Sequence, residues 1–552
     1  MNRYNILNKI CNFFNFSNIL KFLFFILFAT LILKGSFFYL NPDLGWHLEI
    51  GQKIISENEI QVIEQRDFPI IGKPWIDHEW LMNAITFFVY DHFGYITTSL
   101  LFGTIAMLTL FILIYFVSKK YKFQTNSTIV VQIIAIFGLI GSLPFFGVRM
   151  QQISVLYLLV FLIVIENYEK KYSTLKLLWL IPILCVWSFS HAGFFTGVLL
   201  ILLWILTKSF EYLLMEINCL EKIKKFFNLD KKIDKKKRLK IIFTFSLISA
   251  MSVLSTLLMP HGIKIYEFVI ECFNPFMFSH IAEWIPIYSY PINYIGLIYI
   301  GIVISGFLWI FIKHFYLKDE NFIKLTTWEI ALFFFFLAMT IKSRRNFPLF
   351  FIVTFPFTVK TYVDLFMPVK NIFPKSNLTK IFKIFLLAIL VLLNVSNFLQ
   401  IRFTNKPFQS YCDSYPCKAI DFLKNSSFSN AKMFNPYDWG GFIIWTWPKK
   451  QIFIDGRFPA YPINGKSFLE EYYDFFDKDK VEQKLDQYDI GIVLLKKREK
   501  INLNWIDKYI FSINAETINS KKNELLEYLS DSSQWSQVYQ DEISIIYVKN
   551  DI

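Results

Sequence analysis

The sequence of 552 residues lacks the short motifs that mark several common chemistries. It has only six cysteines and seven histidines, and no set of them has the spacing of zinc ligands. It contains neither the GxxxxGKS/T phosphate-binding loop nor the GxSxG nucleophile elbow. These absences argue against zinc, P-loop nucleotide and serine-hydrolase chemistries.

Cysteine is also a scarce source of crosslinks. Cys412 and Cys417 lie close together after the last apolar run. They would close a small loop in an oxidising compartment, and the sequence leaves this open. The other four are scattered without a pattern and are expected to be inert: Cys11, Cys185, Cys219 and Cys272.

Apolar side chains are present in excess. The composition is 54% hydrophobic and includes 63 Phe, more than a soluble chain of this length can bury. Lys and Arg (57) outnumber Asp and Glu (44), but the surplus lies in short loops between apolar runs. Such loops orient membrane helices, so we predict a multi-pass protein of the lipid bilayer with no nucleic-acid partner.

Eleven apolar runs are candidate spans, since a bilayer core of about 30 Å needs roughly 20 residues per helix. The run at 153–165 is short, and the pair broken at 190–193 is alternatively one bent helix. The runs are 22–40, 84–117, 127–146, 153–165, 176–190, 193–207, 241–259, 292–312, 326–341, 346–364 and 381–400.

Loop charges predict the orientation of these spans. Arg3, Lys9 and Lys21 precede the first run, which has no cleavage site, so we predict an uncleaved span and a cytoplasmic N-terminus. Eleven spans then place the C-terminal region on the extracytoplasmic side of the cytoplasmic (inner) membrane. The loops that would face the cytoplasm are all basic and begin at Lys119, Lys170, Lys208, Lys313 and Lys370.

The composition changes near residue 400. AKMF, QIFIDG and DIGIVLL are typical of strands, SFLEEYYDFF of a helix, and QWSQVYQDEISIIYVK of a hairpin. We predict a transmembrane domain over 1–400, with an extracytoplasmic loop at 41–83, and a soluble extracytoplasmic α/β domain over 401–552. Gly440-Gly441 and Asp455-Gly456-Arg457 are interpreted either as ligand contacts or as ordinary turns, the latter with an ion pair.

Titratable groups gather in the first outer loop. Asp43 and His47 are four residues apart in DLGWHLEIG and share a face if the segment is an interfacial amphipathic helix. WIDHEWL places Asp77, His78 and Glu79 between two tryptophans. This cluster suits a substrate hydroxyl, a metal or a phosphate. Alternatively it only begins a helix, with Asp77 as its N-cap.

Arginines at the outer ends of spans contradict the positive-inside pattern. Arg149, Arg344 and Arg345 therefore suggest an anionic partner, with phosphate a natural candidate, although arginines also snorkel to lipid or pair with carboxylates. Further polar groups fall on the same side: His191, His261, Glu271 and Glu283.

These segments resemble the type C (GT-C) integral-membrane glycosyltransferases. DLGWHLEIG, KPWIDHEWL, VRMQQ, SHAG, AEWIP, SRRNFPLF, NPYDWGGFIIW and IFIDGR are similar to a bacterial and archaeal branch of that fold without an established substrate. The resemblance covers both regions of the chain. It departs at Gly45, where an aromatic residue is common, and at Met150, where proline is expected.

The resemblance implies inverting transfer of a sugar from a polyprenyl-phosphate donor to a glycan, lipid or protein acceptor on the outer face. It implies that Asp43 is the base or helps to hold a divalent cation, and that arginines bind the carrier phosphate. The residue types agree, since a carboxylate accepts the acceptor proton; Asp77 and Glu79 are second candidates. The candidate substrate-binding residues are His47, His78, Arg149, His191, Glu283, Arg344, Arg345, Asp455 and Arg457.

Two other classes of protein stay open. A transporter or flippase would place ionisable groups at the bilayer midplane and show repeated halves, and neither pattern is evident. A non-catalytic envelope assembly protein has no feature against it. The enzyme hypothesis predicts that Asp43, His78 and Arg344 line one outward cavity, and that the C-terminal domain covers the active face or binds the acceptor.

Overall fold

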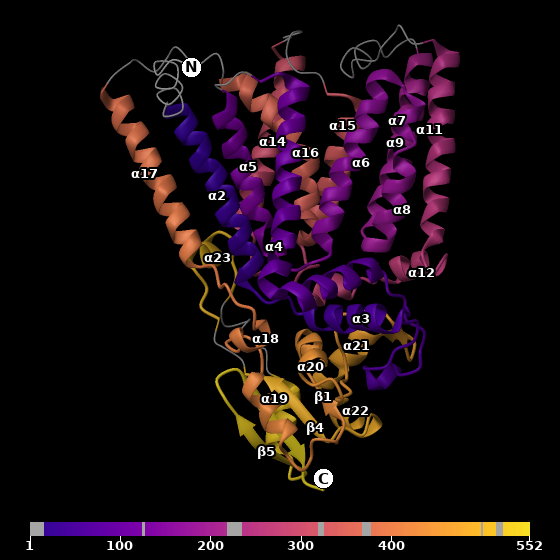
Figure 1. Cartoon of the computed structure of the whole chain (residues 1–552), viewed down its shortest axis with the longest axis vertical. Coiled ribbons are helices and arrows are strands. Elements are labelled where there is room, and N and C mark those ends of the chain that lie inside the picture. Colours follow the sequence, from indigo (N-terminus) through magenta and orange to yellow (C-terminus); the bar gives the residue numbers. More distant parts are fainter. Residues whose placement is uncertain are drawn as a thin grey trace.

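The computed structural model describes residues 16–123, 127–217, 234–317, 325–366, 377–497, 501–514 and 523–551. A bundle of long helices forms one end of the molecule, and a smaller part with short strands forms the other (Figure 1). Arg3, Lys9, Cys11, Cys219 and Lys370 lie outside the described residues.

A helix is found at each predicted apolar run. Eight helices in the described ranges are long and apolar enough to cross a membrane, so the chain is a multi-pass membrane protein. The total of eleven spans and their orientation stay predictions. The helices are α2 (Phe16–Phe38), α4 (Trp80–Tyr121), α5 (Thr128–Ser142), α6 (Gln151–Lys171), α7 (Thr174–Leu177), α8 (Leu180–Ser190), α9 (Phe194–Glu216), α11 (Lys235–Ser255), α14 (Tyr294–Phe315), α15 (Thr327–Lys342), α16 (Phe347–Phe366) and α17 (Asn377–Leu399).

Two breaks shape the bundle near the site. Gly94 has a φ of +77°, which interrupts the 42-residue α4 and separates its first turns from the part that is long enough to span. His191 is extended between α8 and α9, so this pair forms two helices and not one bent helix.

The first loop folds into helix α3 (Leu44–Glu57), which lies across the end of the bundle (Figure 1). Its residues 44–48 are all buried, against α4 on one side and α20 (Gly440–Thr446) on the other. The prediction of an interfacial helix on lipid is therefore wrong, because protein and not lipid covers its apolar face. Trp46, within this helix, is only 4% exposed.

The C-terminal region contains a four-stranded mixed sheet in the order β1-β4-β6-β5. Strand β1 (Met433–Phe434) is parallel to β4 (Ile492–Lys496), and β6 (Ser544–Lys549) is antiparallel to β4 and to β5 (Trp535–Gln540). A second, two-stranded sheet pairs β2 (Pro462–Ile463) with β3 (Lys466–Ser467). The accompanying helices are α18 (Pro407–Ser410), α19 (Cys417–Lys424), α21 (Phe468–Tyr473), α22 (Val481–Gln487), α23 (Trp505–Tyr509) and α25 (Glu524–Asp531).

The structure answers the open question of the disulfide and contradicts one strand prediction for this region. Cys412 and Cys417 form a disulfide. QIFIDG does not form a strand within its own domain. Instead Ile452 makes a single parallel bridge with Asp67 of the first loop, so its backbone partner comes from the distant N-terminal region.

The first loop and the C-terminal region share one apolar core, which includes Leu44 and Leu48 of α3 together with Phe442 and Ile443 of α20. The two helices touch through glycine. A Cβ on Gly45 would lie 1.8 Å from the carbonyl oxygen of Gly441. No side chain fits there, which explains the departure from an aromatic residue at this position.

Candidate functional site

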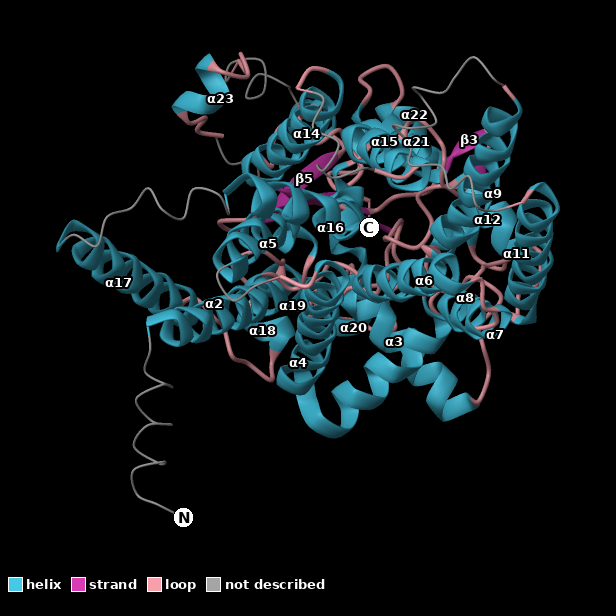
Figure 2. Cartoon of the chain, turned by 90° about the horizontal axis from the view of Figure 1, so that it is seen from above, coloured by secondary structure: helices cyan, strands magenta, loops and turns pink. Residues whose placement is uncertain are grey.

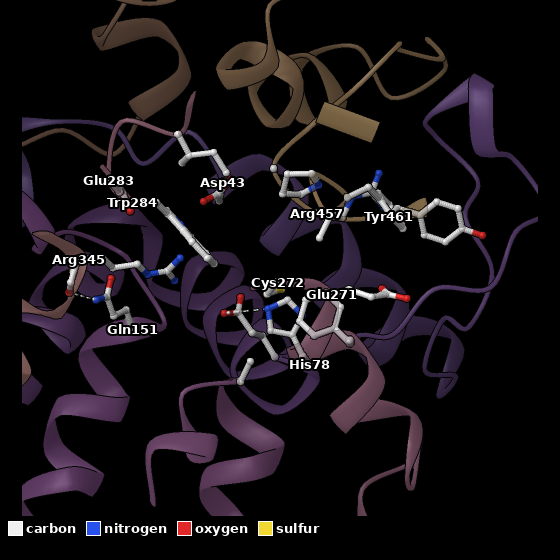
Figure 3. A pocket seen from close by; sticks show the side chains of 18 of the residues that line it. Asp43, His78, Gln151, Glu271, Cys272, Glu283, Trp284, Arg345, Arg457 and Tyr461 are labelled. Atoms are coloured by element: carbon white, nitrogen blue, oxygen red, sulfur yellow. Dashed lines mark hydrogen bonds and ion pairs between the residues drawn. The ribbon is translucent and has the colours of Figure 1, made fainter. Parts of the chain in front are cut away.

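A cavity of about 1430 Å³ lies between the helix bundle and the C-terminal region. We call it the central cavity. Its lining includes Asp43, His78, Arg149, Glu283 and Arg345 from the bundle side and residues 456–462 from the C-terminal side. Figure 3 shows Asp43, Glu283, Arg345, His78 and Arg457 around the open space.

Asp43 immediately precedes α3 and lines the central cavity. The indole Nε1 of Trp46 donates a hydrogen bond of 3.0 Å to its Oδ1. The backbone of Gly456 approaches the same oxygen so closely that a Cβ there would lie 2.2 Å away. Burial raises the pKa of Asp43, although His47 and the bond from Trp46 act in the opposite direction. Its carboxyl is thus a stronger base than an ordinary aspartate when ionised.

Arg149 and Glu283 form an ion pair at the same wall of the cavity. Burial alone would raise the pKa of Glu283, but Arg149 and the nearby Arg345 lower it. Both charges act on Asp43, with Glu283 raising its pKa and Arg149 lowering it.

Arg345 presents a cation to the cavity. Its guanidinium lies 5.2 Å from the centre of the Trp284 ring, and its peptide N–H donates to the Glu283 carbonyl. Within the described residues no carboxylate forms an ion pair with this guanidinium. It is therefore available to an anionic ligand.

Arg344 behaves differently from its neighbour. Its guanidinium donates to the backbone carbonyls of Pro291 and Ala282, and the residue is 9% exposed. It does not line the central cavity. The prediction that Asp43, His78 and Arg344 share one cavity is wrong for Arg344, because the short 3₁₀ turn η6 (Arg344–Asn346) points it into the loop and Arg345 into the cavity.

Three histidines surround Glu79 at the floor of the cavity. His47, His78 and His191 have a ring nitrogen 3.7, 3.5 and 3.4 Å from a carboxylate oxygen of Glu79. Burial alone would raise the pKa of Glu79, but these rings lower it to about 2. The histidines therefore favour the ionised form of the carboxylate, which makes Glu79 a weaker base than Asp43.

His191 is held as a neutral donor. The N–H of Gly193 donates to its Nδ1 at 2.8 Å, so the proton of the neutral ring lies on Nε2, which faces Glu79. Burial lowers its pKa to about 3. The three histidine rings thus hold the negatively charged carboxylate of Glu79 in one orientation.

Comparisons with known proteins give matches in structure and none in sequence. The sequence matches no protein-family model and no curated protein. Three structures of the oligosaccharyltransferase of Archaeoglobus fulgidus are similar. The form tethered to an acceptor peptide has a TM-score of 0.50 at 9% identity and covers 98% of this chain and 74% of that one. The chain has the GT-C fold. The complex with dolichol-phosphate and an inhibitory peptide gives 0.47 at 10% identity (92% and 72% covered), and the apo form gives 0.46 at 8% (86% and 69%).

In this GT-C chain Asp77 lies beneath the cavity floor and not in its lining. It is 1% exposed and accepts hydrogen bonds from the Glu79 N–H at 3.1 Å and from Asn83 Nδ2 at 3.0 Å. Asn83 Oδ1 in turn accepts from His47 Nδ1 at 2.7 Å. Burial raises the pKa of Asp77 to about 6. The prediction that Asp77 is the N-cap of this helix is wrong, because α4 begins at Trp80 with Glu79 as its N-cap. Asp77 instead holds the backbone of Glu79 just before the helix.

The Asp455-Gly456-Arg457 turn forms a buried ion-pair cluster. The Arg457 guanidinium lies 2.6 Å from Asp455, 2.9 Å from Glu64 and 3.3 Å from Asp67, measured between nitrogen and oxygen. All four side chains are at most 1% exposed. This geometry favours the structural interpretation, since the cluster joins the first loop to the C-terminal region. Arg457 nevertheless contributes atoms to the cavity wall.

Single-sequence reasoning missed several groups of the site. Trp284 lies in AEWIP and Tyr437 in NPYDWGGFIIW, but neither was a candidate site residue, although both line the cavity. Glu64 lies in none of the quoted segments, and its contact with Arg457 joins residues far apart in the chain. The Gly440-Gly441 pair serves close packing: Gly440 lies against Ile454 and Asp455, and Gly441 lies against Pro42 and Trp46 at the start of α3.

The resemblance allowed for a divalent cation held in part by Asp43. Among the described residues no group of three or more His, Cys, Asp or Glu is placed to hold a metal ion. We therefore assign no step of the chemistry to one.

Proposed function

We propose that this protein transfers a sugar from a polyprenyl-phosphate donor to an acceptor at the extracytoplasmic face of the cytoplasmic membrane, with inversion at the anomeric carbon. The observation that carries the proposal is the placement of a buried carboxylate, Asp43, and an arginine, Arg345, that forms no ion pair within the described part of the chain, in one cavity at the end of the bundle. Such a pair suits proton removal on one side of a sugar and phosphate binding on the other.

The lining of the cavity supports this assignment. Apolar side chains from the bundle, including Phe195, Leu199, Met339 and Leu349, form its membrane side, where the first part of a polyprenyl chain would lie. The C-terminal region forms the opposite side and leaves room for an acceptor. We propose that this region, with its extracytoplasmic location, covers the active face.

The reaction assigns a role to each group. The acceptor hydroxyl oxygen attacks the anomeric carbon and transfers its proton to Asp43 as the carbon–oxygen bond to phosphate breaks. The leaving polyprenyl phosphate gains negative charge, which Arg345 and Arg149 stabilise. Glu79 and the histidines that surround it form the floor of the cavity below the proposed sugar site.

The arrangement of charge does not favour the transporter hypothesis. The carboxylates, histidines and arginines discussed here gather at one end of the bundle beside the C-terminal region, whereas transport requires groups near the midplane. A non-catalytic assembly role would leave Arg345 and the basic carboxylate of Asp43 in the cavity without a function.

The test supplies purified protein in nanodiscs with radiolabelled polyprenyl-phosphate sugars and a panel of acceptors. We expect transfer by the native chain and a loss of about 10²–10⁴-fold in Asp43→Asn, because the amide cannot accept the proton. Asp91→Asn is the matched control, since Asp91 has a 59% exposed side chain on α4 outside the cavity. Undiminished transfer by Asp43→Asn would remove Asp43 from the role of base.

A further inference from the structure

Residues 501–514 of the C-terminal region lie beside the start of α14 in the helix bundle. In Figure 1 their helix α23 lies near the lower ends of the long helices, away from the sheet, and in Figure 2 it lies outside the bundle next to α14. We call residues 501–514 the foot.

Polar contacts hold the foot to α14. Asp507 accepts a hydrogen bond from the hydroxyl of Tyr294, the first residue of α14, and Asn504 Nδ2 donates to the same hydroxyl at 3.2 Å. The ring of Phe511 lies 5.9 Å from that of Tyr294. Asp507 is 4% exposed, so its carboxylate is buried where the foot meets α14.

The same residues fix the direction of the short helix. The Asn504 side chain accepts from the Asp507 N–H at 2.9 Å, and an Asp507 oxygen accepts from the Asn504 N–H at 3.2 Å. This reciprocal capping box sets the start of α23. Because Asp507 faces α14, the residues on the other side of the helix face outward.

The outward side is strongly apolar. Trp505 is 65% exposed, Tyr509 is 80% exposed and Ile510 is 60% exposed, and residues 505 and 509 share one helix face. In the described part of 401–551, the other exposed large apolar side chains are Phe403 at 49% and Val538 at 37%, both less exposed than these three. The exposed apolar surface of this otherwise water-soluble region is thus concentrated in the foot.

The position of the foot identifies what covers it. Tyr294 is the first residue of the candidate span Tyr294–His314, so the contact lies where the apolar part of α14 begins. Tryptophan and tyrosine prefer that level of a bilayer, and Lys508 offers an exposed cation for anionic headgroups. We propose that the foot inserts Trp505, Tyr509 and Ile510 into the headgroup region of the bilayer and so anchors the C-terminal region to the membrane surface.

The test uses spin labels on the full chain in nanodiscs of phosphatidylglycerol and phosphatidylethanolamine. The background replaces Cys11, Cys185, Cys219 and Cys272 with serine and keeps the Cys412–Cys417 disulfide. Labels are placed separately by Trp505→Cys, Tyr509→Cys and Lys508→Cys. Val538→Cys on strand β5 is the matched control. The accessibility of each label to oxygen, which concentrates in lipid, is compared with that to a water-soluble nickel chelate.

We expect an oxygen-to-nickel ratio several-fold higher at 505 and 509 than at 538. Lys508→Cys keeps all three apolar contacts, so it gives the same measurement if an aromatic replacement fails to fold. A ratio equal to that of the control would show the foot in water and overturn the proposal. Protection from both reagents would overturn it as well, because a protein partner or a second copy of the chain would then cover the surface.

Discussion

At the scale of single residues, two neighbouring arginines divide structural and ligand-binding work. Arg344 donates to two backbone carbonyls, whereas Arg345 faces the central cavity with its guanidinium over Trp284. The pair therefore offers an internal comparison of the two roles at adjacent positions.

We predict opposite outcomes for the two arginines. Arg345→Gln should lower kcat/KM for the lipid-linked donor by about 10²-fold or more and leave Tm unchanged, because a contact to developing phosphate charge is lost. Arg344→Gln should lower Tm, because the carbonyls of Pro291 and Ala282 lose their partner. Kinetics and thermal unfolding of both variants provide the check. Equal loss of Tm in both would contradict the division.

The pH dependence of kcat/KM should also depend on the groups that surround Asp43. A base must be ionised, so transfer should rise with pH through the raised pKa of Asp43. Trp46→Phe removes a hydrogen bond that favours the ionised form, so the acidic limb of kcat/KM should move to higher pH. Trp505→Phe, far from the cavity, should leave the limb in place. An unmoved limb in Trp46→Phe would show that this bond does not tune the base.

At the scale of elements, the crossing of α3 and α20 decides where Asp43 lies. Gly45 permits contact with the Gly441 carbonyl, and Asp43 immediately precedes the same helix. Any shift of α3 is therefore a shift of the proposed base relative to Gly456.

We predict that Gly45→Ala destabilises the protein by about 1–3 kcal/mol, since the added methyl must displace backbone. Gly301→Ala in α14 is the matched control. A Cβ there meets nothing within 4 Å, so the change should be neutral or slightly stabilising. Thermal unfolding in nanodiscs distinguishes the two. A Gly45→Ala protein as stable as the control would show that the helices separate without penalty.

At the scale of the whole molecule, the cluster around Arg457 fastens the first loop to the C-terminal region. One guanidinium compensates Glu64, Asp67 and Asp455. Burial and the two neighbouring carboxylates raise the pKa of Asp67 well above its ordinary value. The folded state thus holds that proton more tightly than the unfolded chain, and its stabilising effect is lost as pH rises through the raised pKa.

We predict that Arg457→Met destabilises the protein by about 3–5 kcal/mol, because three buried carboxylates lose their counter-charge. Acidification should restore part of this stability, since protonation removes their repulsion. Arg402→Met, which breaks the exposed pair with Asp413, should have little effect at any pH. Thermal unfolding between pH 5 and 8 tests both. A variant whose stability is independent of pH would contradict this account of the cluster.

Local patterns in the sequence predicted more than distant contacts did. Apolar runs identify membrane helices because each run satisfies its own backbone within lipid. The amphipathic pattern of residues 43–51 predicted a helix. It did not predict whether protein or lipid covers the apolar face, because both bury such a face equally well. The η6 turn determines which of Arg344 and Arg345 points into the cavity, and no pattern in the sequence predicts this turn. The bridge between Ile452 and Asp67 joins distant parts of the chain, so neighbouring residues do not predict it either.

The bond from Arg457 to Glu64 joins residues 393 positions apart. During synthesis at about 5–20 residues per second, the first loop therefore waits about 20–80 s before its partners exist. Throughout that interval α3 has no α20 to cover it, and its apolar face requires temporary cover from lipid or a chaperone. The proposed active site can form only after most of the chain has been made, because the cavity lining includes Arg457, Lys496 and Asn523. A product of translation that ends before residue 456 would lack residues 456–462 of the cavity wall.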